Sequence, residues 1–421
     1  MAKTRNGTLW HGRIFVLSLL VQNPTAADRK ETAAEPAPRV ATRAWRRRLA
    51  AATAALPDEI LVWEIFVRLP ANDVLHCRAV CRHWRGLTSA TDFLLAHHRR
   101  QPSLLLVMQH SEESPDPALE GCYPVLGLDD YNGLKFYTFN DYNGFKIHAS
   151  CDGLLLISLP NGSFSVCNPA TRQCAPLPCL NAAADRLDTA AALYLHRPSD
   201  EYRVIYWKWR DQADHLEDAA YYIVMVGQGH SPRCIGVPPR IQKAMMACYR
   251  TAPPVVLHNC LHWERDFGDA DILVFDTVAE SFRLMRRPAD ATRLCARLCD
   301  IEGSIGFSCF DDGRTAAKIW VLQDYDREVW SFKYHVELPL KSLYNLQDAQ
   351  HLVLSHKGDV LVCDHSYGNM FHCDNTGKLL ESWWSMSFII GPWFKESLVK
   401  HDFFPRQSCT WLGQPRFFQR L

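Results

Sequence analysis

Beyond residue 102 the sequence is a long series of short apolar segments separated by turn dipeptides. The segments typical of β-strands are 104–108, 136–139, 154–159, 164–167, 203–209, 221–226, 272–275, 318–322, 352–355 and 360–363. The dipeptides between them favour tight hairpins: Asn132-Gly133, Asn143-Gly144, Asp152-Gly153, Asn161-Gly162, Asp312-Gly313 and Lys357-Gly358. No long amphipathic helix interrupts the series, so we expect a mostly antiparallel β domain over residues 103–400.

A repeat is visible within this region. Residues 166–172 contain the end of a strand, a turn that begins with a short polar residue, and a charged residue where the next strand begins. Residues 274–280 and 372–378 show the same pattern. The hairpin 319–330 has its turn near Asp326, and a fifth turn is expected within 211–218. Successive turns are about 45–60 residues apart, close to the length of a four-stranded propeller blade. The pattern predicts a β-propeller of six or seven blades, with a two-sheet sandwich as the alternative.

A different pattern lies at residues 56–70, with the sequence LPDEILVWEIFVRLP. Pro57 suits the first turn of a helix, because its missing N–H would be unpaired there anyway. Pro70 ends the helix, since the residue before a proline is disfavoured in the α region. Eight of the twelve residues between the prolines are large and apolar. Only the pair Glu64 and Arg68 keeps one side polar beyond the first turn, so most of this helix needs a cover.

Two more helices are predicted after Pro70. Asn72 or Asp73 can cap the first, and the second spans residues 91–100. Apolar residues recur in the first at spacings of three and four: Val74, Cys77, Cys81 and Trp84. Three short helices within about 45 residues are near the lower size limit for independent folding. The favoured interpretation is a partner protein that covers the remaining apolar face, and the alternative is a helical cap packed on the downstream domain.

Composition excludes several classes of function. The chain has 421 residues with 46 basic and 46 acidic side chains, which gives no general argument for binding nucleic acid or an anionic membrane. Its 16 cysteines are irregularly spaced and contain no CxxC pair. This favours buried, reduced thiols over a zinc site or a disulfide framework, also for the densest group, Cys167, Cys174 and Cys179. Reduced thiols indicate a reducing compartment, and we expect the protein in the cytoplasm or nucleus.

The first 55 residues differ from the rest of the chain. Residues 14–21 form an apolar run that resembles a signal peptide, but the cysteine usage argues against export and the run is too short to span a bilayer. Residues 26–55 are rich in Ala, Arg, Glu and Pro, which predicts disorder. Arg46–Arg48 is more typical of a solvated helix end than of a nuclear localisation signal. The expected plan is a disordered segment 1–55, a helical module 56–100, a β domain 103–400 and a C-terminal tail 401–421.

No catalytic or metal-binding constellation stands out in the sequence. His258 and His262 are four apart, as in a zinc metalloprotease helix, but the segment resembles a strand and Asn259 replaces the glutamate base. Asp129, Asp130 and Asp141 lack the ligand spacing of a calcium loop. We therefore expect a protein that is not an enzyme and that holds no cofactor and no metal.

The helical region resembles an F-box, a small module that docks on the Skp-family adaptor of cullin-based ubiquitin ligases. The resemblance rests on Leu56-Pro57-Asp58-Glu59-Ile60-Leu61, Ile65, Leu69-Pro70, Leu75, Arg78, Val80-Cys81, Trp84, Leu87 and Phe93. Val62 and Trp63 stand where the family is often polar. The resemblance implies that the adaptor-binding residues are Leu56, Pro57, Ile60, Leu61, Ile65, Leu69, Pro70, Leu75, Val80, Cys81 and Trp84.

The β region is similar to the F-box-associated domain of plant F-box proteins. The similarity rests on Ser150-Cys151-Asp152-Gly153-Leu154-Leu155, Asn168-Pro169-Ala170-Thr171-Arg172, Val274-Phe275-Asp276 with Glu280 and Phe282, and Ile319-Trp320-Val321-Leu322 with Trp330. It implies a propeller-like domain that binds an unknown target protein, and hence the non-catalytic substrate-recognition subunit of an SCF-type ubiquitin ligase that reaches a cullin through the adaptor. The alternative is a propeller enzyme or carbohydrate-binding propeller behind an unrelated helical module.

The best candidate for a target-binding loop is the polar segment 210–219. Trp207 and Trp209 precede it, Tyr221 and Tyr222 follow it, and Trp, Tyr and Arg dominate interface energies when exposed. The favoured alternative is that these aromatic residues fill blade cores and the charges solvate a hairpin turn.

Overall fold

The computed structural model has two compact units. It describes residues 57–109, 127–131, 134–140, 146–158, 164–177, 189–209, 219–227, 231–235, 253–264, 271–292, 296–301, 303–313, 315–338, 349–355, 357–364, 369–384 and 387–404. Of these, residues 57–69 and 73–93 belong to the first unit, and residues 70–72 and 94–404 belong to the second. The predicted disordered segment 1–55 therefore lies outside the described residues.

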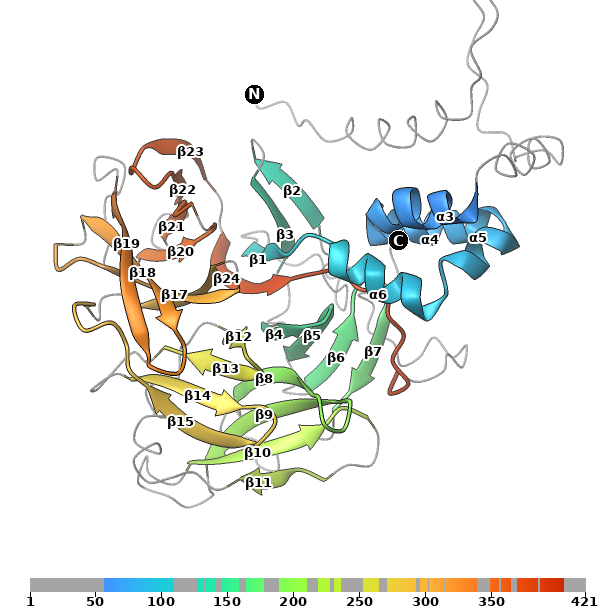
Figure 1. Ribbon diagram of the computed structural model, residues 1–421, viewed down its shortest axis with the longest axis horizontal. Helices are drawn as coiled ribbons and strands as arrows, with labels where there is room; N and C mark the ends of the chain where they lie inside the picture. The colour runs from blue at the N-terminus through green and yellow to red at the C-terminus, as the bar shows by residue number, and fades with distance from the viewer. Residues whose placement is uncertain are drawn as a thin grey trace, which may run out of the picture. The chain divides into compact units, whose positions relative to one another are not determined.

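The helical region contains six short segments (Figure 1). They are α3 (Asp58–Ile60), the π-helical η1 (Leu61–Ile65), the 3₁₀-helical η2 (Phe66–Arg68), α4 (Ala71–Val80), α5 (Arg82–Leu87) and α6 (Thr91–Arg100). The predicted third helix, at residues 91–100, is confirmed by α6.

The proline-bracketed helix is confirmed, but it is not a uniform α-helix. The Pro57 carbonyl accepts the N–H groups of Ile60 and Leu61, both at 3.1 Å, and Leu69 leaves the helix in an extended conformation before Pro70. In its middle, the Phe66 N–H donates to the Leu61 carbonyl, five residues back. Such i→i+5 turns are rare and usually short. Four apolar residues of this stretch are buried: Leu61, Val62, Phe66 and Val67.

The second predicted helix is corrected by a break at Cys81. Its backbone is extended, with φ −153° and ψ 161°, and its Sγ accepts the Trp84 N–H at 3.4 Å, so the cysteine caps α5 as a serine often does. Neither Asn72 nor Asp73 is a cap, because α4 already begins at Ala71.

The described strands of the second unit form six four-stranded sheets. The first strands are β1 (Leu104–Gln109), β2 (Gly127–Tyr131), β3 (Leu134–Asn140), β4 (Lys146–Cys151), β5 (Leu154–Ser158), β6 (Phe164–Asn168), β7 (Gln173–Pro176), β8 (Thr189–His196), β9 (Glu201–Trp209), β10 (Ala219–Met225), β11 (Arg233–Ile235) and β12 (Val255–Leu257). The others are β13 (Cys260–Trp263), β14 (Ile272–Asp276), β15 (Ser281–Met285), β16 (Arg297–Ile301), β17 (Ser304–Phe310), β18 (Ala316–Asp324), β19 (Val329–Glu337), β20 (Ala349–Val353), β21 (Val360–Asp364), β22 (Asn369–Cys373), β23 (Leu379–Trp384) and β24 (Ser387–Phe394).

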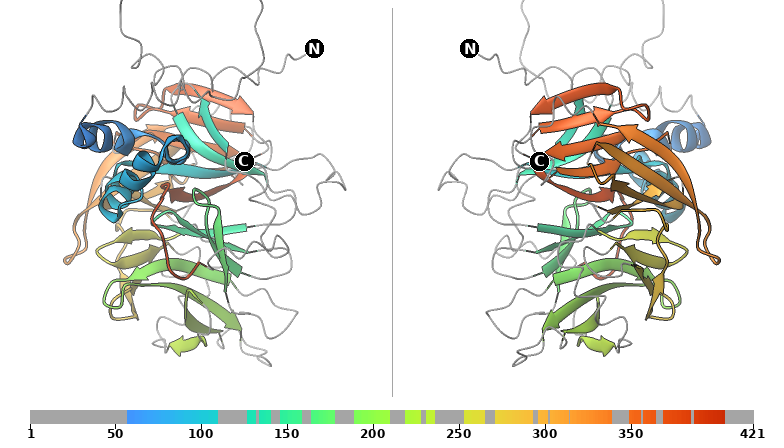
Figure 2. Two further views of the ribbon diagram at one scale, coloured as in Figure 1. Left: turned by 90° about the vertical axis from the view of Figure 1, so that its right-hand side faces the viewer. Right: turned by 90° about the vertical axis from the view of Figure 1, so that its left-hand side faces the viewer.

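The sheets follow one another as in a mostly antiparallel β-propeller. The first strands of consecutive sheets are neighbours, β4 with β8, β12 with β16 and β16 with β20, and β24 lies beside β4. In Figures 1 and 2 the colour accordingly advances from sheet to sheet around the unit, with the red β24 beside the blue-green β1. This arrangement excludes the two-sheet sandwich.

The predicted number of blades needs correction. Five sheets are regular blades, each built from four strands that are consecutive in the chain. The sixth has the order β2-β3-β1-β24 and combines the two ends of the unit: β1 pairs antiparallel with β24 and parallel with β3. Six or seven regular blades were expected because the length of the region was divided by the hairpin spacing. Such a division cannot detect a sheet that is assembled from both ends of the region.

The repeat seen in the sequence is the hairpin between the third and fourth strands of a blade. Four such hairpins begin with a side chain whose Oδ1 accepts backbone N–H groups of the turn, namely Asn168, Asp276, Asp324 and Asp374. Each turn also has a residue with positive φ: Arg172, Glu280, Glu328 or Gly377. The predicted fifth turn, at 211–218, is of another kind, because it joins the second and third strands of its blade, β9 and β10.

The apolar cores lie between neighbouring blades rather than within one. One cluster joins β4–β7 residues to β8–β10 residues around Leu156, Val204 and Tyr206. The segment after β24 completes it: Phe404 is buried in this cluster, so packing continues beyond the expected boundary at residue 400. Asn168 Nδ2 also donates to the Ser397 carbonyl at 3.1 Å. The same C-terminal segment requires a glycine at position 153, where φ is +82°, because a Cβ on Gly153 would lie 2.2 Å from the Cβ of Ser397.

Candidate functional site

The helical unit has a small, complete core. Phe66 is fully buried and packs edge-on against Trp84, with ring centroids 5.0 Å apart. Arg78 anchors the loop after α5, since its Nη2 donates to the Thr88 carbonyl at 2.5 Å and its Nε to Thr88 Oγ1 at 3.2 Å. Thr88 Oγ1 in turn donates to the Trp84 carbonyl at 2.8 Å. The unit therefore holds its helices together without using all of its apolar side chains.

Three large apolar side chains of this unit are left exposed: Ile60 by 43%, Trp63 by 41% and Val80 by 41%. The contact between His83 Nε2 and Asp58 Oδ1, at 2.8 Å, brings the start of α3 beside the start of α5. Along the chain, Ile60 follows Asp58 by two residues and Val80 precedes His83 by three. Covering the exposed 43% of Ile60 or 41% of Val80 would gain roughly 1 kcal/mol for each side chain. Such a surface is chemically suited to a protein partner.

The predicted adaptor-binding residues fall into three groups. Pro57, Ile60 and Val80 are exposed; Ile65, Leu69, Pro70, Leu75 and Cys81 are half-buried; Leu61 and Trp84 are buried; and Leu56 lies outside the described residues. The set stays a prediction. Its exposed members are free to touch a partner, whereas Leu61 and Trp84 can act only by shaping the unit.

Sequence reasoning passed over Trp63 as a contact residue, because its position is often polar in the family. Its large exposed fraction was not visible in the sequence, since an all-round apolar helix does not reveal which face is covered. In the structure Val62 and Val67 are buried, whereas Trp63 is 41% exposed.

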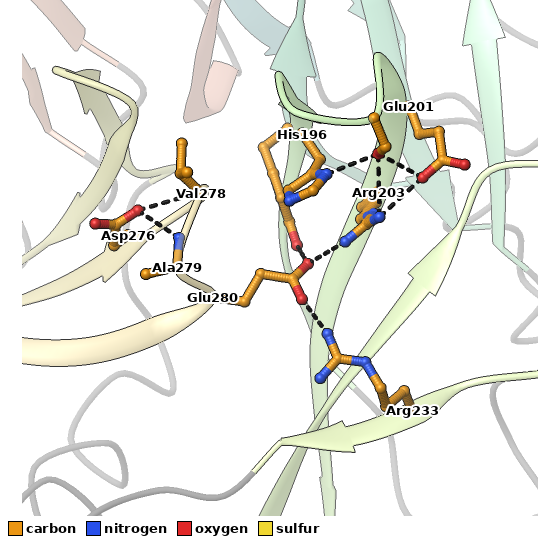
Figure 3. Close-up of polar contacts among 10 residues, drawn as sticks. His196, Glu201, Arg203, Arg233, Asp276, Val278, Ala279 and Glu280 are labelled. Carbon is orange, nitrogen blue, oxygen red and sulfur yellow. Dashed lines mark hydrogen bonds and ion pairs between the residues drawn. The ribbon is translucent and has the colours of Figure 1, made fainter.

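In the β unit, the densest polar contact joins two blades at Glu280 (Figure 3). The Glu280 carboxylate accepts from Arg203 Nη1 at 2.6 Å and from Tyr194 Oη at 2.9 Å, and it also pairs with Arg233. Burial alone would raise the pKa of this carboxyl, but the hydrogen bonds and the arginine charges hold its pKa below the ordinary value. Glu280 lies on the β14–β15 turn and its partners on β8, β9 and β11, so the cluster fastens neighbouring blades together.

The histidine pair set aside in the sequence is structural. His258 and Asn259, with φ of 50° and 59°, form the two-residue turn between β12 and β13. His262 is buried on β13, where Nδ1 lies 3.0 Å from the Val255 carbonyl and Nε2 lies 2.9 Å from Tyr325 Oη. Burial lowers the pKa of His262 to about 4, so its ring is neutral at pH 7. Within the described part of the chain, no three His, Cys, Asp or Glu side chains are grouped to hold a metal ion.

Residues 210–218 of the candidate target loop 210–219 lie outside the described residues. The tyrosines that follow it do pack into the blades. Tyr221 is 5% exposed and contacts the Phe282 ring at 5.0 Å, and Tyr222 stacks on Tyr206 at 5.6 Å. For these two residues the core-filling interpretation applies.

The chain combines a small helical unit with a large β-propeller unit. Family comparison agrees: residues 53–100 match the F-box-like family, and residues 98–373 match the F-box associated beta propeller domain. The chain belongs to the F-box-associated β-propeller family and is an F-box protein.

Two relatives and one solved structure illustrate the similarity. A putative F-box/kelch-repeat protein of Arabidopsis thaliana is 24% identical over 69% of this chain and 73% of its own length. SKP1-interacting partner 15 of Arabidopsis thaliana is 27% identical over 57% of this chain and 70% of its own. The crystal structure of TolB from Acinetobacter baumannii aligns with a TM-score of 0.40 at 10% identity, over 75% of this chain and 73% of that one, which is too distant to support any argument. Among the described residues, no helix is long and apolar enough to cross a membrane.

Proposed function

We propose that this protein is the substrate-recognition subunit of an SCF-type ubiquitin ligase. Residues 56–100 bind a Skp-family adaptor, the adaptor connects them to a cullin, and the β-propeller binds the target protein. The protein itself is not catalytic. The observation that carries the proposal is the exposure of Ile60, Trp63 and Val80 on a helical unit whose core is already complete. The F-box-like match and the relative named for SKP1 interaction support the same partner class.

The described cysteines are all free thiols, which suits the reducing cytoplasm or nucleus where we place this activity. Target recognition is assigned to the propeller because loops at the ends of its strands are free to vary without disturbing the blades.

The adaptor contact is tested by placing a charge on the exposed apolar surface. The full chain with Ile60→Asp is compared with wild type for capture by a purified Skp1-type adaptor. Because a buried, unpaired carboxylate is strongly unfavourable, we expect the dissociation constant to rise by at least about 30-fold, which corresponds to roughly 2 kcal/mol. Ile60 is exposed in the free chain, so the thermal unfolding of the protein should not change.

Val256→Asp is the matched control. Val256 is an exposed aliphatic residue on β12, with 57% of its surface accessible, and receives the same change far along the chain from the F-box. It should leave adaptor capture intact. If Ile60→Asp binds the adaptor as tightly as wild type, the proposed interface is wrong. The double variant Leu56→Ala with Pro57→Ala then decides whether the helix start takes any part in capture.

A further inference from the structure

Two cysteines face each other across the last hairpin of the β4–β7 blade. Cys167 on β6 is opposite Cys174 on β7, and their sulfur atoms are 2.7 Å apart. That separation is only about 0.7 Å longer than a disulfide bond of about 2.04 Å. Sequence reasoning grouped these residues with Cys179, which lies outside the described residues, and interpreted all three as structural thiols.

The backbone register at this pair suits a disulfide. The Leu177 N–H donates to the Phe164 carbonyl at 2.9 Å, so Phe164 and Leu177 are a hydrogen-bonded pair of the ladder. Hydrogen-bonded and non-hydrogen-bonded pairs alternate in an antiparallel ladder, and Cys167 and Cys174 are three steps further on. They therefore occupy a non-hydrogen-bonded position, where Cα atoms are about 4.5 Å apart and the side chains approach most closely. This spacing lies within the range of about 4.4–6.8 Å that a disulfide requires.

The two thiols differ in access and in acidity. Cys174 is partly accessible, whereas Cys167 is 2% exposed. Hydrogen bonds from the Cys167 thiol and from the Ser165 hydroxyl lower the pKa of Cys174. Burial raises the pKa of Cys167. A thiolate is the form that attacks oxidants, so Cys174 is the reactive member and Cys167 the resolving one.

We propose that Cys167 and Cys174 are a reversible redox-modification site, which hydrogen peroxide converts to an intramolecular disulfide. The Cys174 thiolate attacks one peroxide oxygen, the O–O bond breaks, and the hydroxide released takes up the proton lost from Cys174 and leaves as water. The resulting sulfenic acid is attacked by Cys167, which forms the S–S bond and releases a second water that carries the Cys167 proton. One peroxide is reduced by two electrons, and each sulfur loses one. A dithiol reverses the step by exchange.

The bond would fasten a turn that already joins the blade to the end of the domain. Asn168 is next to Cys167 and makes two hydrogen bonds. Its Oδ1 accepts the Thr171 N–H within the turn, and its Nδ2 donates to the Ser397 carbonyl outside the turn. Closing the hairpin beside Asn168 restricts this connection, so oxidation should make the contact with the C-terminal segment harder to open.

Trypsin provides a direct test, because Arg172 lies between the two cysteines. Cleavage after Lys146, Arg172 and Arg186 yields peptides 147–172 and 173–186, which stay together only through a disulfide. The full chain carries Cys151→Ser and Cys179→Ser, so that each peptide retains one cysteine. It is treated with hydrogen peroxide, blocked with N-ethylmaleimide and digested without reductant.

We expect the disulfide-linked pair of peptides to become the main species in mass spectra. The oxidised chains should run as monomers on a non-reducing gel, which shows that the link is intramolecular. Dithiothreitol should separate the pair, and adding Cys174→Ser should abolish it. Cys234, an exposed thiol opposite Tyr222 on β10, reports the peroxide dose. The proposal is overturned if peroxide that oxidises Cys234 leaves Cys167 and Cys174 blocked as free thiols, or converts Cys174 to sulfinic acid without the link.

Discussion

The helical unit and the β-propeller bury their apolar side chains to different extents. Within residues 57–93 the helical unit exposes three large apolar residues, each by about 40%. Among the described residues of the second unit, exposed residues of this kind are scattered: Leu95 on α6, Val256 on β12, Val278 in the β14–β15 turn, Val329 and Phe332 on β19, and Leu380 on β23. In one cluster between two blades, described aromatic residues such as Tyr194, Phe275 and Phe282 fill the space. Each propeller blade buries apolar side chains against the next blade, whereas the helical unit keeps three large apolar side chains exposed.

The charged residues follow the same division. Glu64 and Arg68 in the helical unit form an exposed pair within one helix, with side chains 59% and 58% accessible. Glu280 and Arg203 in the propeller join two blades, with side chains only 11% and 15% accessible. The Glu280–Arg203 pair therefore fixes one blade against the next, whereas the Glu64–Arg68 pair lies in solvent within one helix.

The largest expected effect is loss of the small helical core. Phe66→Ala removes a fully buried ring that packs on Trp84, which should cost about 3–5 kcal/mol. A unit of this size has little stability to lose. We therefore expect amide hydrogen exchange in α4 and α5 to become fast while strands β13, β14 and β17 keep their protection. Retained protection in α4 would show that the unit is held by more than its own core.

A smaller effect is expected from the ion cluster between blades. Glu280→Ala removes the carboxylate that accepts from Arg203 and Tyr194 and leaves the largely buried Arg203 with Glu201 as its remaining ion-pair partner, so the propeller should lose roughly 2 kcal/mol of stability. The matched change Glu64→Ala should cost at most about 0.5 kcal/mol, because that pair is exposed to solvent. Urea unfolding of both variants, monitored by tryptophan fluorescence, measures the two losses. Equal losses would contradict the contrast between the regions.

Much of the helical unit could be predicted from its sequence. Pro57 and Pro70 mark the ends of the first helix because proline acts through fixed local geometry, and Thr91 opens α6. The break at Cys81 was missed, since cysteine is not an expected cap. The π-turn was missed as well, because it depends on how Leu61 and Phe66 pack rather than on any local propensity.

The propeller was predictable where turns carry the information. Asn168, Asp276 and Asp374 mark the same hairpin in three blades, because their short side chains bind the turn N–H groups. The pairing of β1 with β24 was not predictable, since nearly 300 residues separate the two strands and no local signal links them. The contact of Cys167 with Cys174 was accessible in principle: the strand register follows once the turn after Asn168 is placed.

The smallest effect concerns acid stability, which should belong to the propeller. His351 on β20 is 1% exposed, packs against Phe310 at 4.4 Å, and has no hydrogen-bond partner among the described residues for either ring nitrogen. Burial, together with the nearby Arg297 charge, lowers its pKa to about 3, from an ordinary value near 6.5. Between these values the unfolded chain binds a proton that the folded chain does not. Stability is therefore fully present above pH 6.5 and is lost as the pH falls, by about 1 kcal/mol between pH 6.5 and 5.5.

His351→Gln removes this titration but keeps a polar side chain of similar size. Between pH 6.5 and 4.5, the unfolding free energy of this variant should fall less steeply with pH than that of wild type. The difference in slope should correspond to the uptake of close to one proton per molecule on unfolding. His351→Leu should flatten the slope equally and also raise stability near pH 7, because it removes buried nitrogen atoms that lack partners. Denaturant titrations at a series of pH values distinguish the two variants. An unchanged slope in both would mean that His351 binds its proton in the folded propeller as readily as in the unfolded chain, which would contradict the prediction.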